Sequence, residues 1–570
     1  RRARAHGRVV PPARSRAGVT TAAAPARVNN ALGRAWRAAT EVRPAYVLVT
    51  LVGIQWLAVL ALALTVRHNG WLYYAGGDQI WHYTGAYLLA HGHLPPTYVG
   101  YGWSFLLLPV AAIAGPNLVS ALPAMVLFNT LVLLPVALLC MYGIGARIAG
   151  RVFGYFAALL WVALPYLGIV FVEVGYHQKY TELTLPQLLG LTSVPDFPSM
   201  VALIVSAYLC LRALDSARWQ IGALAGLAAG YGIAIKPSNA LFLFAPGLLL
   251  LVERWRSLLA FAAGLAPSLL ALAVWKYRGL GELAAAPGPE LRLAVGPGDL
   301  TRRIFSPKLN SWEHLHQVLL GFREHFWIAR VIEWLPVAGF IGLLARSRRG
   351  VLLVGTWFVV YLLVKGTYLP ASLDDASFFR ILMPAFPAYV LLAASVSLLV
   401  PGARARPGPV RPERAGRRLT IAVVVAFAVF AALPLGVLAA VPRLHDQGSL
   451  AVRAPDTPVP VSGTVGVSQT SGDVRLAWRG MKPGTARAFY HVLRANGANP
   501  DVACAGRLNG SSDNCVLYTQ SIATTRATTF TDRPGPGTWI YRIGVAANWV
   551  DDPKLGDIYV VTKPTTVTVP

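Results

Sequence analysis

The sequence predicts an α-helical polytopic membrane protein followed by a small all-β domain, and three observations predict it. Hydrophobic residues make up 55% of the 570 residues and charged residues only 13%, whereas a soluble protein carries about 25% charge. The mean hydropathy is +0.52. Apolar runs near the roughly 17–25 residues needed to cross a bilayer recur as far as residue 441, and only strand-length runs follow. This composition excludes a disordered protein, a fibrous protein and a cytosolic enzyme.

The first element is a basic tail. Residues 1–44 are rich in Arg, Ala and Pro, and Glu41 is their only acid, so we expect a disordered cytoplasmic tail. No apolar core occurs within the first 30 residues, which argues against a signal peptide. Two roles stay open for this tail, a topology signal and binding of anionic lipid.

The membrane domain is predicted over residues 45–442, with about eleven transmembrane helices. Lys236-Pro237 alone separates the fifth run from the sixth, so ten to twelve spans fit the sequence. The eleven runs are 46–66, 121–143, 152–171, 199–214, 219–235, 238–252, 257–276, 331–345, 351–365, 381–400 and 419–441.

The distribution of arginine predicts the orientation of these spans. With the N-terminus inside, every cytoplasmic connection is basic, as the positive-inside rule requires: these connections are 146–151, 215–220, 253–257, 346–350 and 401–418. The formal charge of +26 is therefore mostly a topology signal, and we expect no nucleic-acid partner. The outer segments are then 67–120, 172–198, the large loop 277–330, 366–380 and everything after 442.

The pattern of apolar and polar residues changes after a linker at 443–458. Seven candidate strands rich in Thr, Val, Tyr and Trp lie between Gly, Pro and Asn turns, which predicts an extracytoplasmic, immunoglobulin-like β-sandwich at 459–570. The candidate strands are 463–469, 473–479, 487–494, 515–522, 526–531, 537–546 and 557–568.

Cysteine use agrees with an outer location for this domain. Cys504 and Cys515 bracket a polar loop and are suited to one disulfide, which requires an oxidising compartment. The stretches VRLAWRG, FYHVLRANG, TTFTDRPGPG and TWIYRIGVAANW resemble a fibronectin type III domain. The resemblance implies that Trp478 is a core anchor, that Tyr541 is the tyrosine corner, and that the domain is a spacer or a binding module.

The first outer loop carries an isolated acid. Asp78 is the only acid between Glu41 and Glu173, and an amphipathic segment with aromatic residues follows it, suited to the membrane interface. A carboxylate held there can act as a general base on a hydroxyl. The alternative is an aspartate that only caps the following helix.

Three motifs resemble the GT-C glycosyltransferases, polytopic enzymes that use sugar carried on a polyprenyl phosphate. They are WLYYAGGDQIWHYTGAYLLAHGHLPPTYVGYGWSFLLLP in the first loop, GIAIKPSNALFLFAPGLLLL at 232–251 and FFRILMPAFPAYVLLAA at 378–394. The similarity covers residues 46–400 and is nearest to the protein-mannosyltransferase-like and aminoarabinose-transferase-like branch. Gln79 stands where many relatives have a second acid.

The resemblance implies roles for individual residues. Asp78 would be the general base, taking a proton from an acceptor hydroxyl that attacks the anomeric carbon with inversion. Cations should hold the leaving phosphate. Arg380 and Lys236 are the first candidates, although Lys236 also fits a lysine that snorkels to the interface. Weaker candidates for the phosphate are His177 and Lys179, which also fit a solvated loop, and the substrate pocket is expected to include Gln79, His82, Tyr101 and Trp103.

Other charged residues have simpler interpretations. Asp196, Asp374 and Asp375 could orient Arg380 or bind sugar hydroxyls, but a surface ion pair is the simpler expectation. His314 and His316 are two residues apart and cannot share a helix face, so we expect no metal. No nucleotide-binding motif is present, so we expect no cofactor and a lipid-linked sugar as donor.

Together, the predicted topology and the resemblance imply a multi-pass glycosyltransferase of a bacterial plasma membrane, with its active site and C-terminal domain outside the cell. The acceptor is a glycan, a protein or a lipid, and the sugar stays open. The alternatives are a transporter or flippase for a lipid-linked or polar substrate, and a scaffold that displays the β domain.

Overall fold

A computed structural model describes most of the membrane domain and parts of the C-terminal domain. The predicted tail, apart from residues 41–44, and the predicted cysteine pair Cys504 and Cys515 lie outside the described residues. The described ranges are 41–65, 77–90, 92, 94, 99–114, 118–216, 218–280, 309–374, 376–400, 417–441, 466–470, 472–478, 487–496, 521–548, 558–561 and 565–570.

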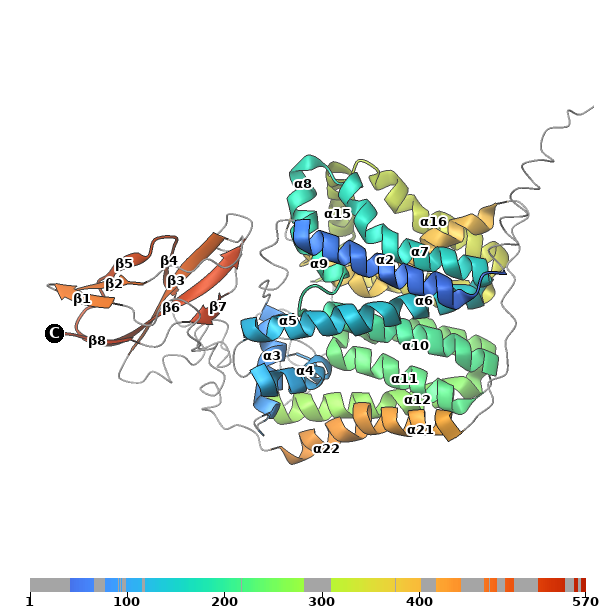
Figure 1. The fold of residues 1–570 in the computed structure, drawn as a ribbon, viewed down its shortest axis with the longest axis horizontal. Helices are drawn as coiled ribbons and strands as arrows, with labels where there is room; N and C mark the ends of the chain where they lie inside the picture. Colours follow the sequence, from blue (N-terminus) through green and yellow to red (C-terminus); the bar gives the residue numbers. More distant parts are fainter. Residues whose placement is uncertain are drawn as a thin grey trace, which may run out of the picture. The chain divides into compact units, whose positions relative to one another are not determined.

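The described residues up to 441 are mostly helical (Figure 1). The α-helices are α2 Pro44–Thr65, α3 Gly77–Ala90, α4 Tyr101–Ala114, α5 Leu118–Phe128, α6 Leu134–Ala149, α7 Arg151–Phe171, α8 Val174–Lys179, α9 Leu185–Leu188, α10 Asp196–Ser216, α11 Trp219–Ile235, α12 Phe244–Leu280, α15 Trp312–His325, α16 Ala329–Arg346, α17 Arg348–Gly350, α18 Thr356–Lys365, α19 Ser377–Leu382, α20 Phe386–Ser395, α21 Arg417–Phe427 and α22 Leu433–Ala440. Short π and 3₁₀ turns join several of them: η1 Asn129–Leu133, η2 Tyr180–Thr184, η3 Pro237–Leu243, η4 Val351–Gly355, η5 Met383–Ala385, η6 Val396–Leu399 and η7 Ala428–Ala432.

Each of the eleven predicted spans falls on helix. Within the described residues, seven helical stretches are long and apolar enough to cross a membrane by length and composition. Helix α11 is apolar but shorter, and one 42-residue stretch, Pro237–Arg278, contains two of the predicted spans. The predicted spans 331–345 and 351–365 are not among the seven stretches. The exact number of crossings therefore stays a prediction.

A break at Arg254 divides this longest stretch into a hairpin. The backbone there is extended, with φ −165° and ψ 84°. Three glycines of α11 face successive turns of the second half of α12: Gly222 lies against Ala260, Gly226 against Leu265, and Gly230 against Ser268. Helix α11 and the second half of α12 thus run in the same direction. The first half of α12 therefore runs the opposite way, and the chain reverses at Arg254, inside the predicted connection 253–257.

The predicted connections between spans lie in two groups, one at each end of the helical part. At one end, Asp215 pairs with Arg147 at 3.1 Å and with Arg349 at 3.2 Å, and Arg349 also pairs with Glu253 at 3.3 Å. These contacts join four connections that the sequence places in the cytoplasm.

Contacts at the opposite end join the predicted outer segments. Val172 forms a β-bridge with Phe326, and the Tyr176 hydroxyl donates to the carbonyl of Leu373 at 2.5 Å. The grouping agrees with the predicted topology, while the assignment of one end to the cytoplasm stays a prediction of the positive-inside rule.

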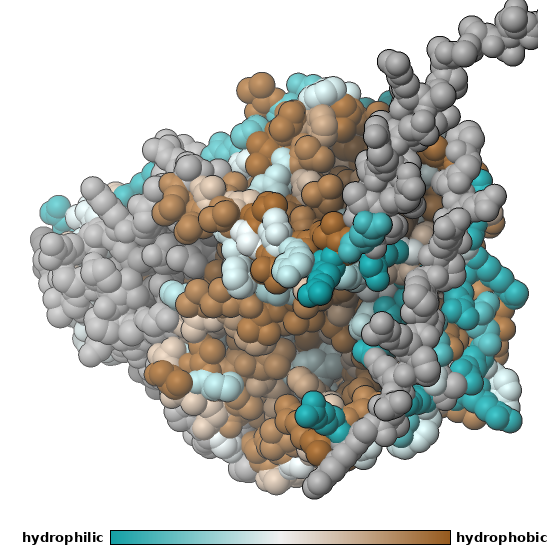
Figure 2. Space-filling view, turned by 45° about the vertical axis from the view of Figure 1, so that its right-hand side comes forward, coloured by the Kyte–Doolittle hydropathy of each residue, from teal (hydrophilic) through white to brown (hydrophobic). Residues whose placement is uncertain are grey.

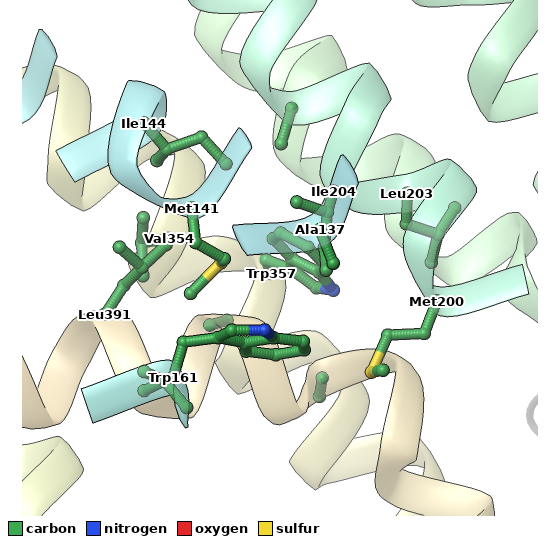
Figure 3. Packing of buried hydrophobic residues seen from close by; sticks show 14 of the residues in the cluster. Ala137, Met141, Ile144, Trp161, Met200, Leu203, Ile204, Val354, Trp357 and Leu391 are labelled. Atoms are coloured by element: carbon green, nitrogen blue, oxygen red, sulfur yellow. The ribbon is translucent and has the colours of Figure 1, made fainter. Parts of the chain in front are cut away.

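Tryptophan and methionine side chains fill the centre of the helical part. Figure 3 shows Trp161 of α7 and Trp357 of α18 packed near Met141 and Leu391, and both tryptophans are at most 3% exposed. Much of the face shown in Figure 2 is hydrophobic, and large apolar side chains are exposed to the outside: Val49 is 71% exposed and Val424 is 62% exposed. Apolar surface on both the inside and the outside is typical of a helix bundle in lipid.

The C-terminal part forms two antiparallel sheets. One has the order β1-β2-β5 and the other β4-β3-β6-β7, with β8 also paired to β6. The structure describes eight strands where seven were predicted, because the segment 557–568 forms two separate partners of β6. The strands are β1 Gly466–Thr470, β2 Asp473–Ala477, β3 Arg487–Asn496, β4 Ser521–Thr525, β5 Thr529–Asp532, β6 Gly537–Asn548, β7 Ile558–Val561 and β8 Thr565–Val569.

Two residues singled out in this domain are buried. Trp478 is 6% exposed, which confirms it as a core residue. Tyr541 is fully buried, and its hydroxyl donates to the Asp532 carboxylate at 2.6 Å. A tyrosine corner bonds to backbone instead, so the resemblance to fibronectin type III stays a prediction.

Candidate functional site

The isolated acid of the first loop contacts a residue that is predicted to bind the donor phosphate. Asp78 lies in the first turn of α3, and one of its carboxylate oxygens forms an ion pair with the guanidinium of Arg380 on α19. The Asp78 carboxylate is 33% exposed and the Arg380 side chain 22% exposed. A general-base candidate and a cation that are 302 positions apart in the chain thus lie side by side.

A second carboxylate binds the same arginine. Arg380 Nε donates to Asp196 Oδ2 at 3.0 Å, and the other oxygen, Oδ1, pairs with Lys236 Nζ. Four charges therefore alternate in sign in the order Lys236, Asp196, Arg380, Asp78. The elements that carry them are the junction of α11 and η3, the first turn of α10, α19 and α3.

The burial of Asp196 contradicts the expectation of a surface ion pair. Its side chain is 0% exposed, and a buried carboxylate persists only when cations and hydrogen-bond donors compensate its charge. Of the other two acids, Asp374 is exposed, and Asp375 lies outside the described residues. Sequence reasoning named Asp196 as a possible partner of Arg380 but underestimated its burial.

Close contact between α4 and the end of α11 places Lys236. A Cβ at Gly100 would lie 2.0 Å from the carbonyl oxygen of Ala234, and one at Gly102 would lie 2.8 Å from the backbone nitrogen of Ile235. Only glycine permits this approach. Helix α11 ends at Ile235, and the extended backbone of Lys236, φ −134° and ψ 102°, suits the residue before a proline.

Two polar side chains of α3 are buried beside Asp78. Gln79 and His82 are each 1% exposed. Both polar atoms of the Gln79 amide and the Nδ1 atom of His82 have no hydrogen-bond partner in the described structure. Leaving such groups unpaired costs about 1–3 kcal/mol each, and this cost is offset where a ligand binds them. Their place in a substrate pocket stays a prediction.

The imidazole of His82 is neutral at physiological pH. Burial, followed by the charges of Lys276 and Lys236, lowers the pKa of His82 from 6.5 to about 3. Lys276 is 4% exposed, and sequence reasoning missed it. The signal was a lysine near the end of an apolar run, in ALAVWKYRGL. In the described structure, two cations and two carboxylates pair in the site, and the charge of Lys276 also acts on His82.

Tyr101 and Trp103 are packing residues in this conformation. Both are 0% exposed. The Tyr101 hydroxyl donates to the carbonyl of Ser268 at 3.4 Å, and Trp103 Nε1 donates to the carbonyl of Ser193 at 2.9 Å. They connect α4 to α12 and to the segment before Asp196, and contact with a substrate stays a prediction.

The two weaker phosphate candidates lie on α8. His177 is exposed, and Lys179 Nζ lies 5.8 Å from the ring centroid of Tyr176. Tyr176 also stacks on His325 at 4.3 Å, which ties α8 to the end of α15. Neither candidate has a described contact with the Asp78–Arg380 pair, and their role stays a prediction.

His314 of α15 makes a structural contact, whereas His316 lies at the surface. His314 Nε2 donates to the carbonyl of Ala371 at 2.7 Å, and His316 is exposed. Among the described residues, no group of three His, Cys, Asp or Glu side chains is arranged to hold a metal ion.

Comparison with known proteins yields one distant likeness in fold. No family model and no curated protein matches the chain. The apo crystal structure of the oligosaccharyltransferase from Archaeoglobus fulgidus superposes with a TM-score of 0.39 at 14% identity, over 72% of this chain and 58% of that one. This chain thus covers less than two thirds of that protein's length, and a likeness at this level leaves function to be argued from the site.

Proposed function

We propose that this protein is a membrane glycosyltransferase that moves a sugar from a polyprenyl-phosphate donor to an acceptor hydroxyl. The observation that carries the proposal is the pairing of Asp78 with Arg380 inside a set of alternating charges. A carboxylate next to converging cations supplies the two functions that this transfer needs, a proton acceptor and a phosphate ligand.

The reaction divides these functions between named residues. The Asp78 carboxylate accepts the proton of the acceptor hydroxyl while the hydroxyl oxygen forms a bond to the anomeric carbon. The bond between that carbon and the phosphate oxygen breaks, and its electron pair leaves with the polyprenyl phosphate. Arg380 and Lys236 stabilise the negative charge that develops on this phosphate. Attack opposite to the leaving group inverts the anomeric centre.

The surroundings of the site suit a lipid-linked donor. Seven apolar helical stretches in the described residues are long enough to hold the protein in a bilayer, where a polyprenyl chain resides. The site lies at the end of the bundle opposite the arginine-rich connections, since Lys236 and Asp215 are at opposite ends of α10 and α11. The buried amide of Gln79, which has no hydrogen-bond partner among the described residues, suits sugar hydroxyls.

A transporter or flippase is the second candidate. The break between α11 and η3 at Lys236 favours it, because transporters place charged groups at interrupted helices. Those interruptions lie near the membrane midplane, whereas this one lies at the end of α11. Flux of a lipid-linked sugar into proteoliposomes without any transfer product would support the transporter.

Replacing the proposed base tests the glycosyltransferase. Asp78→Asn should insert and fold normally but transfer sugar from a radiolabelled polyprenyl-phosphate donor about 10²–10⁴-fold more slowly, because it removes the proton acceptor. Glu313→Gln is the control, since it neutralises an exposed carboxylate on α15 and should retain full activity. Turnover of Asp78→Asn at the wild-type rate would contradict the mechanism.

A further inference from the structure

Among the described residues, Arg380 has two carboxylate partners, and these lie in very different surroundings. Its Nε atom bonds to Asp196, which is 0% exposed and is held on its other oxygen by Lys236. Its terminal nitrogen bonds to Asp78, which is 33% exposed. The arginine is therefore held on one side by a buried partner and on the other by a partner in contact with solvent.

The two ion pairs differ in how easily they break. Separating Asp196 from its cations would leave a buried, charged carboxylate without the partners that compensate its charge, which is strongly unfavourable. Asp78 is partly exposed and can be hydrated when it leaves Arg380, so breaking its ion pair costs far less. An incoming anion can therefore take the place of Asp78 but not the place of Asp196.

We propose that Asp196 is a positioning residue that holds Arg380 and Lys236 together as a phosphate-binding pair, and that Asp78 occupies the phosphate's place on Arg380 until the donor binds. The inference rests on the proposed function and deepens it. Donor binding exchanges one anion for another on the guanidinium and releases Asp78 to accept the hydroxyl proton. The protein then binds donor before it activates acceptor.

Phosphate is the chemistry that this arrangement fits. Once Asp78 leaves, the terminal nitrogen of Arg380 that it occupied can donate to an oxyanion, and phosphate oxygens accept strongly from guanidinium N–H groups. Lys236, whose side chain is 21% exposed, supplies a second donor on the far side of Asp196. A lipid phosphate and free inorganic phosphate share this chemistry, so the experiment must separate them.

Binding to the full-length protein in nanodiscs tests the exchange without relying on turnover. The probes are a short-chain polyprenyl phosphate, the matching polyprenol and inorganic phosphate. We expect Asp78→Asn to bind the polyprenyl phosphate about threefold to tenfold more tightly than the wild type, because a competing anion is lost. Asp196→Asn should bind it at least about tenfold more weakly, because Arg380 and Lys236 then repel each other and lose their shared anchor.

Three controls make the result specific. In the Arg380→Gln background, Asp78→Asn should no longer change the affinity. Glu313→Gln should bind like the wild type, and the polyprenol should bind all variants equally. If Asp78→Asn binds both phosphates more tightly, the exchange depends on the phosphate charge alone. If it binds only the lipid phosphate more tightly, the lipid is the ligand. Unchanged or weaker binding of both would overturn the proposal.

A kinetic measurement separates positioning from a general structural role. Asp196→Glu keeps the charge and should restore most of the affinity lost in Asp196→Asn. If Asp196→Asn does not fold, the Asp78→Asn result still decides, because that side chain is partly exposed. Asp196→Glu should raise the donor KM more than it lowers kcat, while Asp78→Asn should lower kcat. Normal turnover by Asp78→Asn would refute the proposed base, whereas the binding result tests the exchange independently.

Discussion

At the scale of single residues, the environment of each polar group separates ligand-binding candidates from structural groups. Tyr101 and Trp103 use their polar atoms in bonds between helices, whereas the buried amide of Gln79 has no partner in the described structure. None of these three side chains is charged, so the sequence motif alone does not separate the ligand-binding candidate from the structural residues. An unpaired buried amide costs stability unless a ligand pairs with it, so Gln79 is the stronger candidate for sugar contact.

Replacing this amide should have opposite effects on stability and activity. Gln79→Met removes the unpaired atoms at similar volume, so the free energy of unfolding should stay constant or rise by up to about 1–3 kcal/mol. Sugar transfer, measured as kcat/KM for the donor, should fall about tenfold, the cost of one or two lost hydrogen bonds.

Helix α2 offers a matched control for Gln79. Gln55 is 2% exposed, and its Oε1 atom also lacks a partner in the described residues, but it makes no described contact with the charged site. Gln55→Met should leave transfer unchanged. Wild-type kcat/KM for Gln79→Met would exclude a role for the amide in substrate binding.

At the scale of elements, glycine lets helices approach closely enough to place the charges. Gly100 and Gly102 lie against the last turn of α11, one residue before Lys236. Gly226 of α11 and Gly264 of α12 allow a similarly close contact between these two helices, since an added Cβ at either glycine would lie 1.9 Å from a backbone carbonyl oxygen. Small residues at such contacts are typical of helix packing in membranes.

A methyl group at this contact should displace Lys236. Gly100→Ala would place its Cβ against the carbonyl oxygen of Ala234, which is backbone and cannot rotate away. We expect destabilisation by about 1–3 kcal/mol and weaker binding of polyprenyl phosphate, measured by thermal unfolding and by the nanodisc assay. Gly247→Ala is the control, since nothing lies within 4 Å of its added Cβ. Equal melting temperatures for the two variants would argue against a packing role for Gly100.

At the scale of the whole molecule, charge divides the helical part into two ends. Asp215 and Glu253 gather arginines from several connections at one end, and the Asp78–Arg380 pair lies at the other. The positive-inside rule places the first end in the cytoplasm.

Cysteine labelling tests this orientation. In a Cys504→Ala, Cys515→Ala background, the remaining Cys140 and Cys210 are buried and should not react. His316→Cys and Arg346→Cys both introduce exposed thiols, at the two different ends. A membrane-impermeant maleimide should label His316→Cys in intact cells and Arg346→Cys only after permeabilisation. The reverse pattern would place the candidate site in the cytoplasm.

The sequence by itself determined the positions of the helices, their grouping into two ends and three members of the charged site, Asp78, Arg380 and Lys236. It could do so because a bilayer demands long apolar runs and leaves charges at their ends. Only the tertiary structure decided which charges meet. Asp196 was expected at the surface and is fully buried between two cations, and Lys276 was not noticed at all. These outcomes depend on how helices distant in the chain pack against one another, and periodicity and spacing along a single chain do not specify that packing.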